Sequence, residues 1–389
     1  MKQSLWRAVR GAKAVVPAIL LAGVGLALVG CDGFFVKETT GGGTTTGGTT
    51  GSYAYVANNA SDTSKLSIYA LSGGTLTSSS TFSLGYAPSA LAITPGNTFL
   101  YAANPNTQTL AIYVYSIGST GQLTAANGGN AVALNVDTVA MDISPDGKWL
   151  FALDGLQQQI SEYQINTTTG SLKQVDAVTY QAGNQQLVTP SAIKVGPSGA
   201  FVVAALGTGG DLIFPFATST GALSPYVYLA PPIVAPPALE GDYGATLDAN
   251  NFLYIARTSG LSVYTLSSVG APTIVSGSPF ATGTGSRSVL LSGSGTYVYT
   301  ANQADGTISG FSIDSKGVLT KLSGSPFASV PTVSVLGRDN SGKYILAGGY
   351  DSAAGLKLYT IGSGGVLSPA ASAATGTSTS VPMVMVLTR

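Results

Sequence analysis

One phrase recurs seven times along this chain, and its period constrains the fold more than any other feature. The phrase begins with an aromatic residue and continues through alternating apolar and small residues, as in 99–104 and 297–302. A second alternating run follows, and then a Gly-Xaa-Leu turn such as the one that begins at Gly121. Successive copies start about 45–52 residues apart, a spacing typical of repeat architectures. The copies begin at Tyr53, Phe99, Trp149, Phe201, Phe252, Tyr297 and Tyr344.

Each copy holds about four short segments in which Val, Ile, Leu, Tyr or Phe alternate with small polar residues. Alternation with a period of two, bounded by Gly, Asn, Asp and Pro, predicts half-buried antiparallel strands joined by tight turns. Four strands in each of seven copies predict an all-β fold, a seven-bladed β-propeller with four-stranded antiparallel blades. A solenoid of β-repeats is the alternative, but a solenoid needs capping repeats at its ends.

The two ends of the repeat region indicate how the ring closes. The first copy begins at Tyr53 with what is the second strand of the unit, so its first strand is missing. Residues 381–388, at the other end of the chain, match the missing strand in pattern. We therefore predict that the C-terminal strand joins the N-terminal blade and removes an open sheet edge.

Residues 1–30 have the pattern of a secretory signal peptide, with basic residues followed by an apolar stretch from Ala14 to Val29. The stretch leads into Leu-Val-Gly-Cys, which resembles the bacterial lipoprotein signal, in which the cysteine becomes the acylated N-terminus. Cys31 is the only cysteine, so the chain can form no internal disulfide. The alternative is an uncleaved membrane anchor with an incidental cysteine.

The sequence thus divides into three regions. Residues 1–30 are the predicted signal peptide, 31–52 the lipidated cysteine with a flexible Gly/Thr tether, and 53–389 the seven-bladed propeller. Lipidated Cys31 would hold the protein to a bacterial membrane on its extracytoplasmic side, in the cell envelope.

Composition narrows the range of partners and chemistry. Charged residues make up 9% of the chain, against about 25% in typical globular proteins. Four of the 17 basic residues lie in the leader, so no basic face for nucleic acid is expected. The chain has no histidine, which excludes a Ser-His-Asp triad and the usual zinc sites. We expect a monomer with no metal and no cofactor.

Three features resemble the β-propeller lactonase family: the recurring Tyr-Val-Ala-Asn phrase, the Gly-Xaa-Leu turn, and the duplicated Leu/Val-Ser-Gly-Ser-Pro-Phe of 275–280 and 322–327. That family includes 6-phosphogluconolactonase and the fungal-type muconate cycloisomerases, and it shades into the surface-layer repeats named for Tyr-Val-Thr-Asn. The resemblance covers 53–389 and implies a site at the mouth of the central channel, acting on a lactone. Family members carry a His after the Pro of the repeat, with Arg and Glu nearby, and that His is missing from every copy here.

The few charges that break the repeat gather in its fourth and fifth copies. Asp242 and Arg287 align at one position of adjacent copies, and Glu240 precedes Asp242 by two residues. Arg257 replaces the asparagine that ends the phrase in other copies. The candidate catalytic residues are Glu240, Asp242, Arg257 and Arg287, and the candidate ligand-binding residues are Asp137, Asp154, Arg257 and Arg287.

The chemistry of these residues leaves several functions open. An Arg guanidinium can hold a carboxylate or a phosphate through paired donors, and Glu240 can act as a general base if burial raises its pKa. A set of salt bridges that only stabilises the channel mouth is the alternative. We favour a module that binds a small anionic or lactone ligand or an envelope protein. A lactone hydrolase and a structural cell-surface repeat domain are the other two possibilities.

Overall fold

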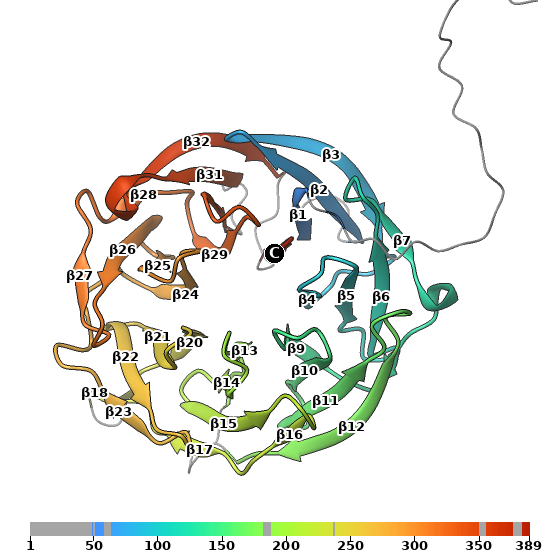
Figure 1. Ribbon diagram of the computed structural model, residues 1–389, viewed down its shortest axis with the longest axis horizontal. Helices are drawn as coiled ribbons and strands as arrows, with labels where there is room; N and C mark the ends of the chain where they lie inside the picture. The colour runs from blue at the N-terminus through green and yellow to red at the C-terminus, as the bar shows by residue number, and fades with distance from the viewer. Residues whose placement is uncertain are drawn as a thin grey trace, which may run out of the picture. The chain divides into compact units, whose positions relative to one another are not determined.

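The computed structural model describes residues 49, 51–57, 64–181, 188–235, 238–349, 355–375 and 383–389. The predicted all-β propeller is confirmed, because seven sheets of antiparallel strands stand around a central axis (Figure 1). Within these ranges the only helical elements are two single 3₁₀ turns, η1 (Asn127–Gly129) and η2 (Ser363–Gly365), and no helix is long and apolar enough to cross a bilayer. The predicted signal peptide, Cys31 and most of the tether lie outside the described residues.

Blades 1 to 4 follow one another around the ring, and their strands are given from the innermost outward; blade 1 takes its innermost strand from the C-terminus. Blade 1 contains β33 (Val384–Leu387), β1 (Ser52–Ala57), β2 (Lys65–Ser72) and β3 (Thr75–Ser83). Blade 2 contains β4 (Ala90–Ile93), β5 (Phe99–Asn104), β6 (Ala111–Ile117), β7 (Leu123–Ala125) and β8 (Ala133–Leu134). Blade 3 contains β9 (Thr138–Ile143), β10 (Trp149–Asp154), β11 (Gln159–Ile165) and β12 (Leu172–Thr179). Blade 4 contains β13 (Ala192–Val195), β14 (Phe201–Ala205), β15 (Asp211–Ala217), β16 (Ala222–Leu223) and β17 (Val227–Leu229).

A two-stranded hairpin, β18 (Ile233–Ala235) with β19 (Ala238–Leu239), precedes blade 5. Blade 5 contains β20 (Asp242–Leu247), β21 (Phe252–Arg257), β22 (Gly260–Leu266) and β23 (Pro272–Ile274). Blade 6 contains β24 (Ser286–Leu291), β25 (Tyr297–Asn302), β26 (Thr307–Ile313), β27 (Leu319–Lys321) and β28 (Phe327–Ala328). Blade 7 contains β29 (Val333–Arg338), β30 (Tyr344–Gly349), β31 (Gly355–Ile361) and β32 (Leu367–Ala374).

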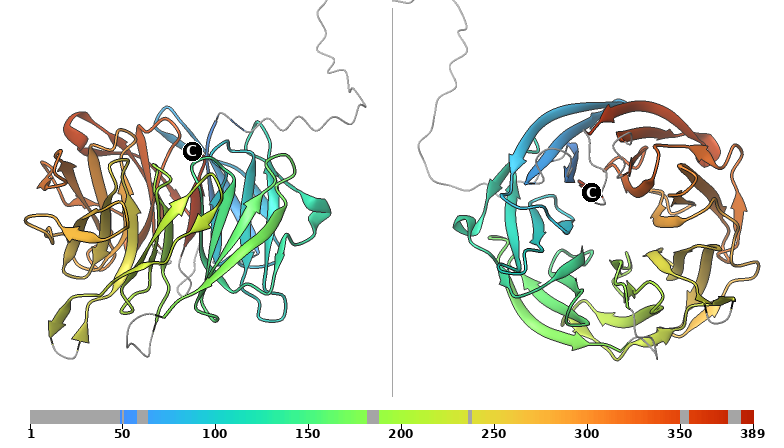
Figure 2. Two further views of the ribbon diagram at one scale, coloured as in Figure 1. Left: turned by 60° about the horizontal axis from the view of Figure 1, so that its bottom comes forward. Right: turned by 180° about the vertical axis from the view of Figure 1, so that it is seen from behind.

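The C-terminal strand closes the ring as the sequence predicts. Strand β33 pairs antiparallel with β1, from Ala54 opposite Leu387 to Ala57 opposite Val384. Beyond this strand, the Thr388 hydroxyl accepts a hydrogen bond from the backbone N–H of Tyr53 at 2.9 Å. The C-terminus consequently lies close to the ring axis, as Figure 2 shows from behind.

The core is divided among the interfaces between blades. Seven clusters of buried apolar residues are present, and each cluster draws its members from two neighbouring blades. At every interface the aromatic residue that begins the repeated phrase packs against a glycine in the next blade. All seven glycines have positive φ. The pairs are Tyr53 with Gly121, Phe99 with Gly170, Trp149 with Gly221, Phe201 with Gly270, Phe252 with Gly317, Tyr297 with Gly365, and Tyr344 with Gly74.

Hydrogen bonds from tyrosine reinforce three of these interfaces. The hydroxyls of Tyr55, Tyr101 and Tyr299 donate to the carbonyl oxygens of Gly121, Gly170 and Gly365, at 2.8, 2.8 and 2.7 Å. Each of these tyrosines is the third residue of its phrase and is fully buried. The phrase therefore supplies both an aromatic ring and a buried donor to the same turn of the next blade.

These contacts predict that Gly317→Ala destabilises the protein much more than Gly295→Ala. Both glycines have positive φ, 77° and 70°, so each substitution strains the backbone by about 1–2 kcal/mol. A Cβ at Gly317 would lie 2.6 Å from Cδ1 of Phe252, whereas nothing lies within 4 Å of one at Gly295. Overpacking adds about 1–3 kcal/mol at Gly317 only. Urea unfolding measures the difference, and equal losses of stability in the two variants would contradict it.

Candidate functional site

The strand register of blades 5 and 6 corrects one prediction from the sequence. Asp242 pairs with Arg257 at the start of blade 5, and Ser286 takes the same place in blade 6. A β-bulge follows in each inner strand, where Tyr243 and Arg287 are the extra residues. The alignment of Asp242 with Arg287 is therefore wrong by one residue. Arg287 corresponds to Tyr243.

A shift of one residue decides which way a side chain points in a strand. Asp242 is fully buried inside the propeller, whereas Arg287 is only half-buried. Bulges are common at the rims of barrels and beside binding sites because they redirect a side chain. Here they present Tyr243 and Arg287 at the rim where the inner strands of blades 5 and 6 begin.

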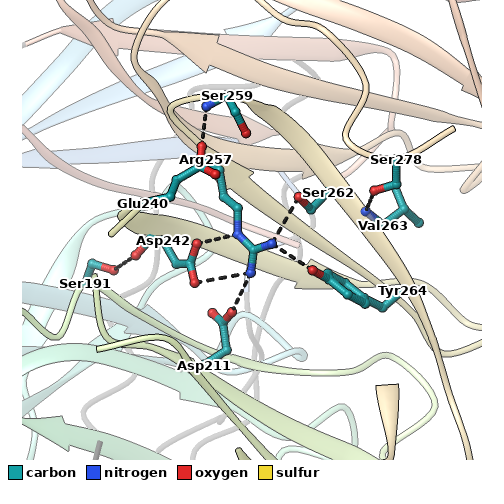
Figure 3. A network of polar contacts seen from close by, with 10 residues as sticks. All are labelled: Ser191, Asp211, Glu240, Asp242, Arg257, Ser259, Ser262, Val263, Tyr264 and Ser278. Carbon is teal, nitrogen blue, oxygen red and sulfur yellow. Dashed lines mark hydrogen bonds and ion pairs between the residues drawn. The ribbon is translucent and has the colours of Figure 1, made fainter. Parts of the chain in front are cut away.

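Arg257 is the centre of a closed polar network (Figure 3). Its Nε and Nη2 donate to the two carboxylate oxygens of Asp242, and Nη2 also lies 3.3 Å from Oδ2 of Asp211. Its Nη1 donates to the Tyr264 hydroxyl at 2.7 Å and to Oγ of Ser262 at 3.1 Å. Arg257 is 1% exposed and both aspartates are 0% exposed. The network therefore offers no surface to a ligand.

The two carboxylates of this network share one cation. Burial raises the pKa of Asp211 well above its usual range, the Asp242 charge raises it further, and Arg257 opposes both effects. Burial also raises the pKa of Asp242, but its paired hydrogen bonds and ion pair with Arg257 oppose that effect. We infer that Asp211 is the residue of the two that keeps a proton above the usual aspartate range, and that Asp242 carries the charge that balances Arg257. The sequence analysis missed Asp211. Its signal is an acidic residue at the start of β15, where blades 2, 5 and 6 begin the same strand with Ala111, Gly260 and Thr307.

Glu240 is also buried, with 1% of its surface exposed. Its carboxylate accepts a hydrogen bond from the backbone N–H of Ser259, in the turn between β21 and β22. Three of the four predicted catalytic residues, Glu240, Asp242 and Arg257, lie near one another at the start of blade 5 (Figure 3). All three are buried, with at most 1% of their surface exposed.

The two other candidates lie in and beside blade 3, which blade 4 separates from blade 5. Asp154 is fully buried and accepts backbone hydrogen bonds from Leu156 at 2.8 Å, Gln157 at 2.6 Å and Asp137 at 3.1 Å. Asp137 is half-buried, and burial and then the Asp154 charge raise its pKa. Asp154 therefore holds the turn after β10 in place and is not grouped with Arg257 or Arg287.

Arg287 is the one predicted site residue that combines partial exposure with open donors. Its Cζ lies 3.7 Å from the ring centroid of Tyr243, and its Nε donates to Oε1 of Gln303 at 2.9 Å. Among the described residues, no acceptor engages its Nη1 or Nη2. A cation over a tyrosine face is held electrostatically, so the guanidinium plane is fixed while its outer nitrogens stay open. Sequence reasoning identified neither Tyr243 nor Gln303.

The described part of the chain has no cluster of side chains that could bind a metal ion. No group of three or more Asp, Glu or Cys side chains is placed to hold a metal ion there. The charged residues of blade 5 instead engage one another, Asp211 of blade 4, nearby hydroxyl groups and the backbone.

No model of a known protein family and no curated protein matches this chain. Solved structures do resemble it. A proposed 6-phosphogluconolactonase from Bacteroides fragilis has a TM-score of 0.63 and 17% identity, with 82% of this chain and 93% of that one covered. One from Bacteroides uniformis has a TM-score of 0.66 and 18% identity, with coverage of 82% and 95%. The chain has the fold of the β-propeller lactonases.

A third structure gives the same result. The periplasmic gluconolactonase of Pseudomonas aeruginosa has a TM-score of 0.62 and 16% identity, and 86% of this chain and 99% of that one are covered. The family resemblance found in the sequence is thus confirmed for the fold. Identities of 16–18% establish a shared fold and leave the activity to be argued from the site.

The buried network predicts that Arg257→Met is strongly destabilising and that Asp211→Asn is not. Removing the guanidinium leaves Asp242 buried without a cation, which lowers the free energy of unfolding by about 3–5 kcal/mol. Asparagine resembles a protonated aspartic acid in shape, so Asp211→Asn changes stability by at most about 1 kcal/mol. Denaturant unfolding at pH 7 compares the two variants. A large loss in Asp211→Asn would show that Asp211 is ionised in the folded protein.

The pH dependence of stability gives a second measurement on the same pair. Folded Asp211 keeps its proton above pH 4, whereas in the unfolded chain it ionises near its ordinary pKa of about 4. The folded state then binds more protons, so this residue makes stability fall as pH rises above about 4. Asp211→Asn should remove that part of the decrease, and identical profiles for variant and wild type would contradict the assignment.

Proposed function

We propose that this propeller is an extracytoplasmic binding module for a small carboxylate or phosphate ligand, held by Arg287. The observation that carries the proposal is a half-buried guanidinium with two open nitrogens at the rim between blades 5 and 6. The fork of an arginine matches the two oxygens of a carboxylate or phosphate, and such paired bonds are stronger than neutral ones. Tyr243 and Gln303 fix the guanidinium beforehand, so less side-chain freedom is lost on binding.

The acidic residues of blade 5 do not compete for this cation. Asp242 is engaged by Arg257, and Glu240 accepts a backbone hydrogen bond from Ser259. Both carboxylates are buried and already bonded, and neither forms an ion pair or hydrogen bond with Arg287 among the described residues. This separation of buried acids from a rim cation favours an anionic ligand.

The second candidate is a lactone hydrolase, which the gluconolactonase among the structural neighbours favours. Ring opening of a lactone needs a base for water and a donor for the developing oxyanion. Arg287 can supply the donor. Glu240 and Asp242 are buried, so no exposed carboxylate accompanies it in blade 5. We therefore consider ligand binding the better-supported function and lactone hydrolysis the second. A structural repeat domain without any ligand is the third candidate.

One experiment separates these candidates. We expect gluconate or 6-phosphogluconate to bind the wild type in calorimetry, and Arg287→Gln to weaken binding about tenfold or more through loss of a charged, paired contact. Lys316→Gln removes one charge from an exposed residue of blade 6 and should leave binding unchanged. No binding of either anion, or equal binding by Arg287→Gln, would overturn the proposal.

The hydrolase reading is tested on the same proteins with glucono-δ-lactone. Release of acid above the spontaneous rate by wild type, reduced in Arg287→Gln, would establish the enzyme. Anion binding without such hydrolysis would support the binding module. If the protein neither binds an anion nor hydrolyses the lactone, the structural repeat domain is the remaining candidate.

We also propose that acylated Cys31 anchors this module to the membrane, with the propeller on a Gly/Thr tether. The proposal rests on the signal-like residues 1–30 and on the position of the only cysteine. Because stable anchoring needs more than one acyl chain, a lipoprotein modification would suffice and an unmodified residue would not. In bacteria labelled with radioactive palmitate, Cys31→Ser should lose the label and leave the membrane fraction. An unlabelled wild type that still sediments with membranes would indicate an uncleaved anchor.

A further inference from the structure

A groove of about 440 Å³ lies between blades 1 and 2. These two blades stand across the ring from blade 5, as Figure 1 shows. Residues 82–86 of blade 1 form one wall, and the β5–β6 loop with the middle of β6 forms the other. The outer edge of blade 2 is interrupted here, because β7 and β8 both pair with β6 and η1 lies between them. The groove belongs to no part of the Arg287 site.

The lining of this groove has a distinct chemistry. It combines four aromatic rings with amide and hydroxyl side chains, and none of its residues is charged. The rings of Tyr86, in the connection between β3 and β4, and Tyr113, in β6, lie 5.3 Å apart at an angle of 32°. Tyr113 is half-buried, and no partner among the described residues engages its hydroxyl. Tyr115 is buried, and the Tyr86 hydroxyl is hydrogen-bonded to it and to the Ala102 carbonyl. The surface open to a ligand therefore comes from the half-buried rings of Phe82, Tyr86 and Tyr113 and from the Tyr113 hydroxyl.

The amides beside the rings are held in fixed positions. Asn104 donates to Oγ1 of Thr109 at 3.2 Å and accepts from the backbone N–H of Asn106 at 3.0 Å. The Asn106 side-chain oxygen accepts from the backbone N–H of Gln108 at 3.0 Å. Its Nδ2 engages no acceptor among the described residues and is exposed. The loop therefore presents a positioned amide donor at the edge of the groove.

We propose that this groove binds a neutral carbohydrate of one or two sugar units. Aromatic faces pack on the apolar C–H face of a sugar ring, while amides and hydroxyls exchange hydrogen bonds with its hydroxyl groups. A charged ligand would lie here without a counter-charge, and an aliphatic one would leave the amides unpaired. The volume is within the range of about 300–1,000 Å³ found for small-molecule sites. This site is independent of the anion proposed for Arg287.

The test uses the full-length protein in a polyoxyethylene detergent, which contains no sugar. Glucose, N-acetylglucosamine, cellobiose and chitobiose are titrated to about 10 mM, which detects dissociation constants in the millimolar range. Saturation-transfer NMR should mark the C–H protons of one sugar face. We expect Tyr113→Leu, which keeps apolar bulk but removes the aromatic face, to weaken binding about tenfold or more.

A matched pair of variants isolates the amide. Asn106→Asp keeps the acceptor for the Gln108 N–H but removes the open donor, and should weaken binding about tenfold. Asn166→Asp makes the same change at an exposed turn of blade 3, where the side-chain oxygen accepts from Thr168, and should leave binding within about twofold. Arg287→Gln should also bind the sugar normally, which separates this site from the anion site.

Two results would overturn the proposal. One is a folded wild type that binds none of the four sugars at about 10 mM. The other is sugar binding that survives unchanged in both Tyr113→Leu and Asn106→Asp. If Tyr113→Leu fails to fold by circular dichroism, Asn106→Asp decides alone, because its side chain is exposed.

Discussion

The contact of an aromatic ring with a glycine of the next blade is the interaction on which this structure depends. A single blade cannot cover the apolar faces of its own sheet. Each of the seven apolar clusters is formed by two neighbouring blades. At five of the seven contacts a Cβ on the glycine would lie less than 3 Å from the ring, so only glycine allows the turn to approach so closely. At Gly74 and Gly270 a Cβ would lie 3.5 and 3.6 Å from the ring, and there the positive φ is the reason for glycine. Because the contact recurs at all seven interfaces, including Tyr344 with Gly74 between blades 7 and 1, packing supports ring closure alongside the pairing of β33 with β1.

The same contact explains why the fold could be predicted from the sequence. Its two partners are the first aromatic residue of the phrase and the glycine of the turn after the second run, so they repeat with the period of the blade. This glycine begins a Gly-Xaa-Leu turn in six blades, and in blade 5 Gly270 is followed by Ala-Pro. The β-bulges could not be predicted in this way. A bulge adds one residue at the start of a short inner strand, too near its end for the alternation to mark it. The pairing of Asp242 with Arg257, and of Ser286 with Asn302 in blade 6, reveals it.

The burial of the charged residues also could not be predicted from their positions in the sequence. The sequence marks Arg257 as an exception to the repeated asparagine, but it does not say that Asp211 of blade 4 reaches the same guanidinium. The two residues are 46 positions apart, and their contact depends on how two blades pack. Asp154 shows the same limit, since its substitution for asparagine preserves an acceptor for the turn after β10 and adds no exposed charge.

The difference between the two arginines of this region decides where a ligand can bind. Arg257 donates to Asp242, Asp211, Ser262 and Tyr264 and has no exposed surface to offer. Arg287 keeps two nitrogens open. The buried network still contributes to the rim, because Asp242 directly precedes Tyr243 in β20. By fixing Asp242 against Arg257, it holds the bulge that places the Tyr243 ring under Arg287, so the closed network positions the open cation.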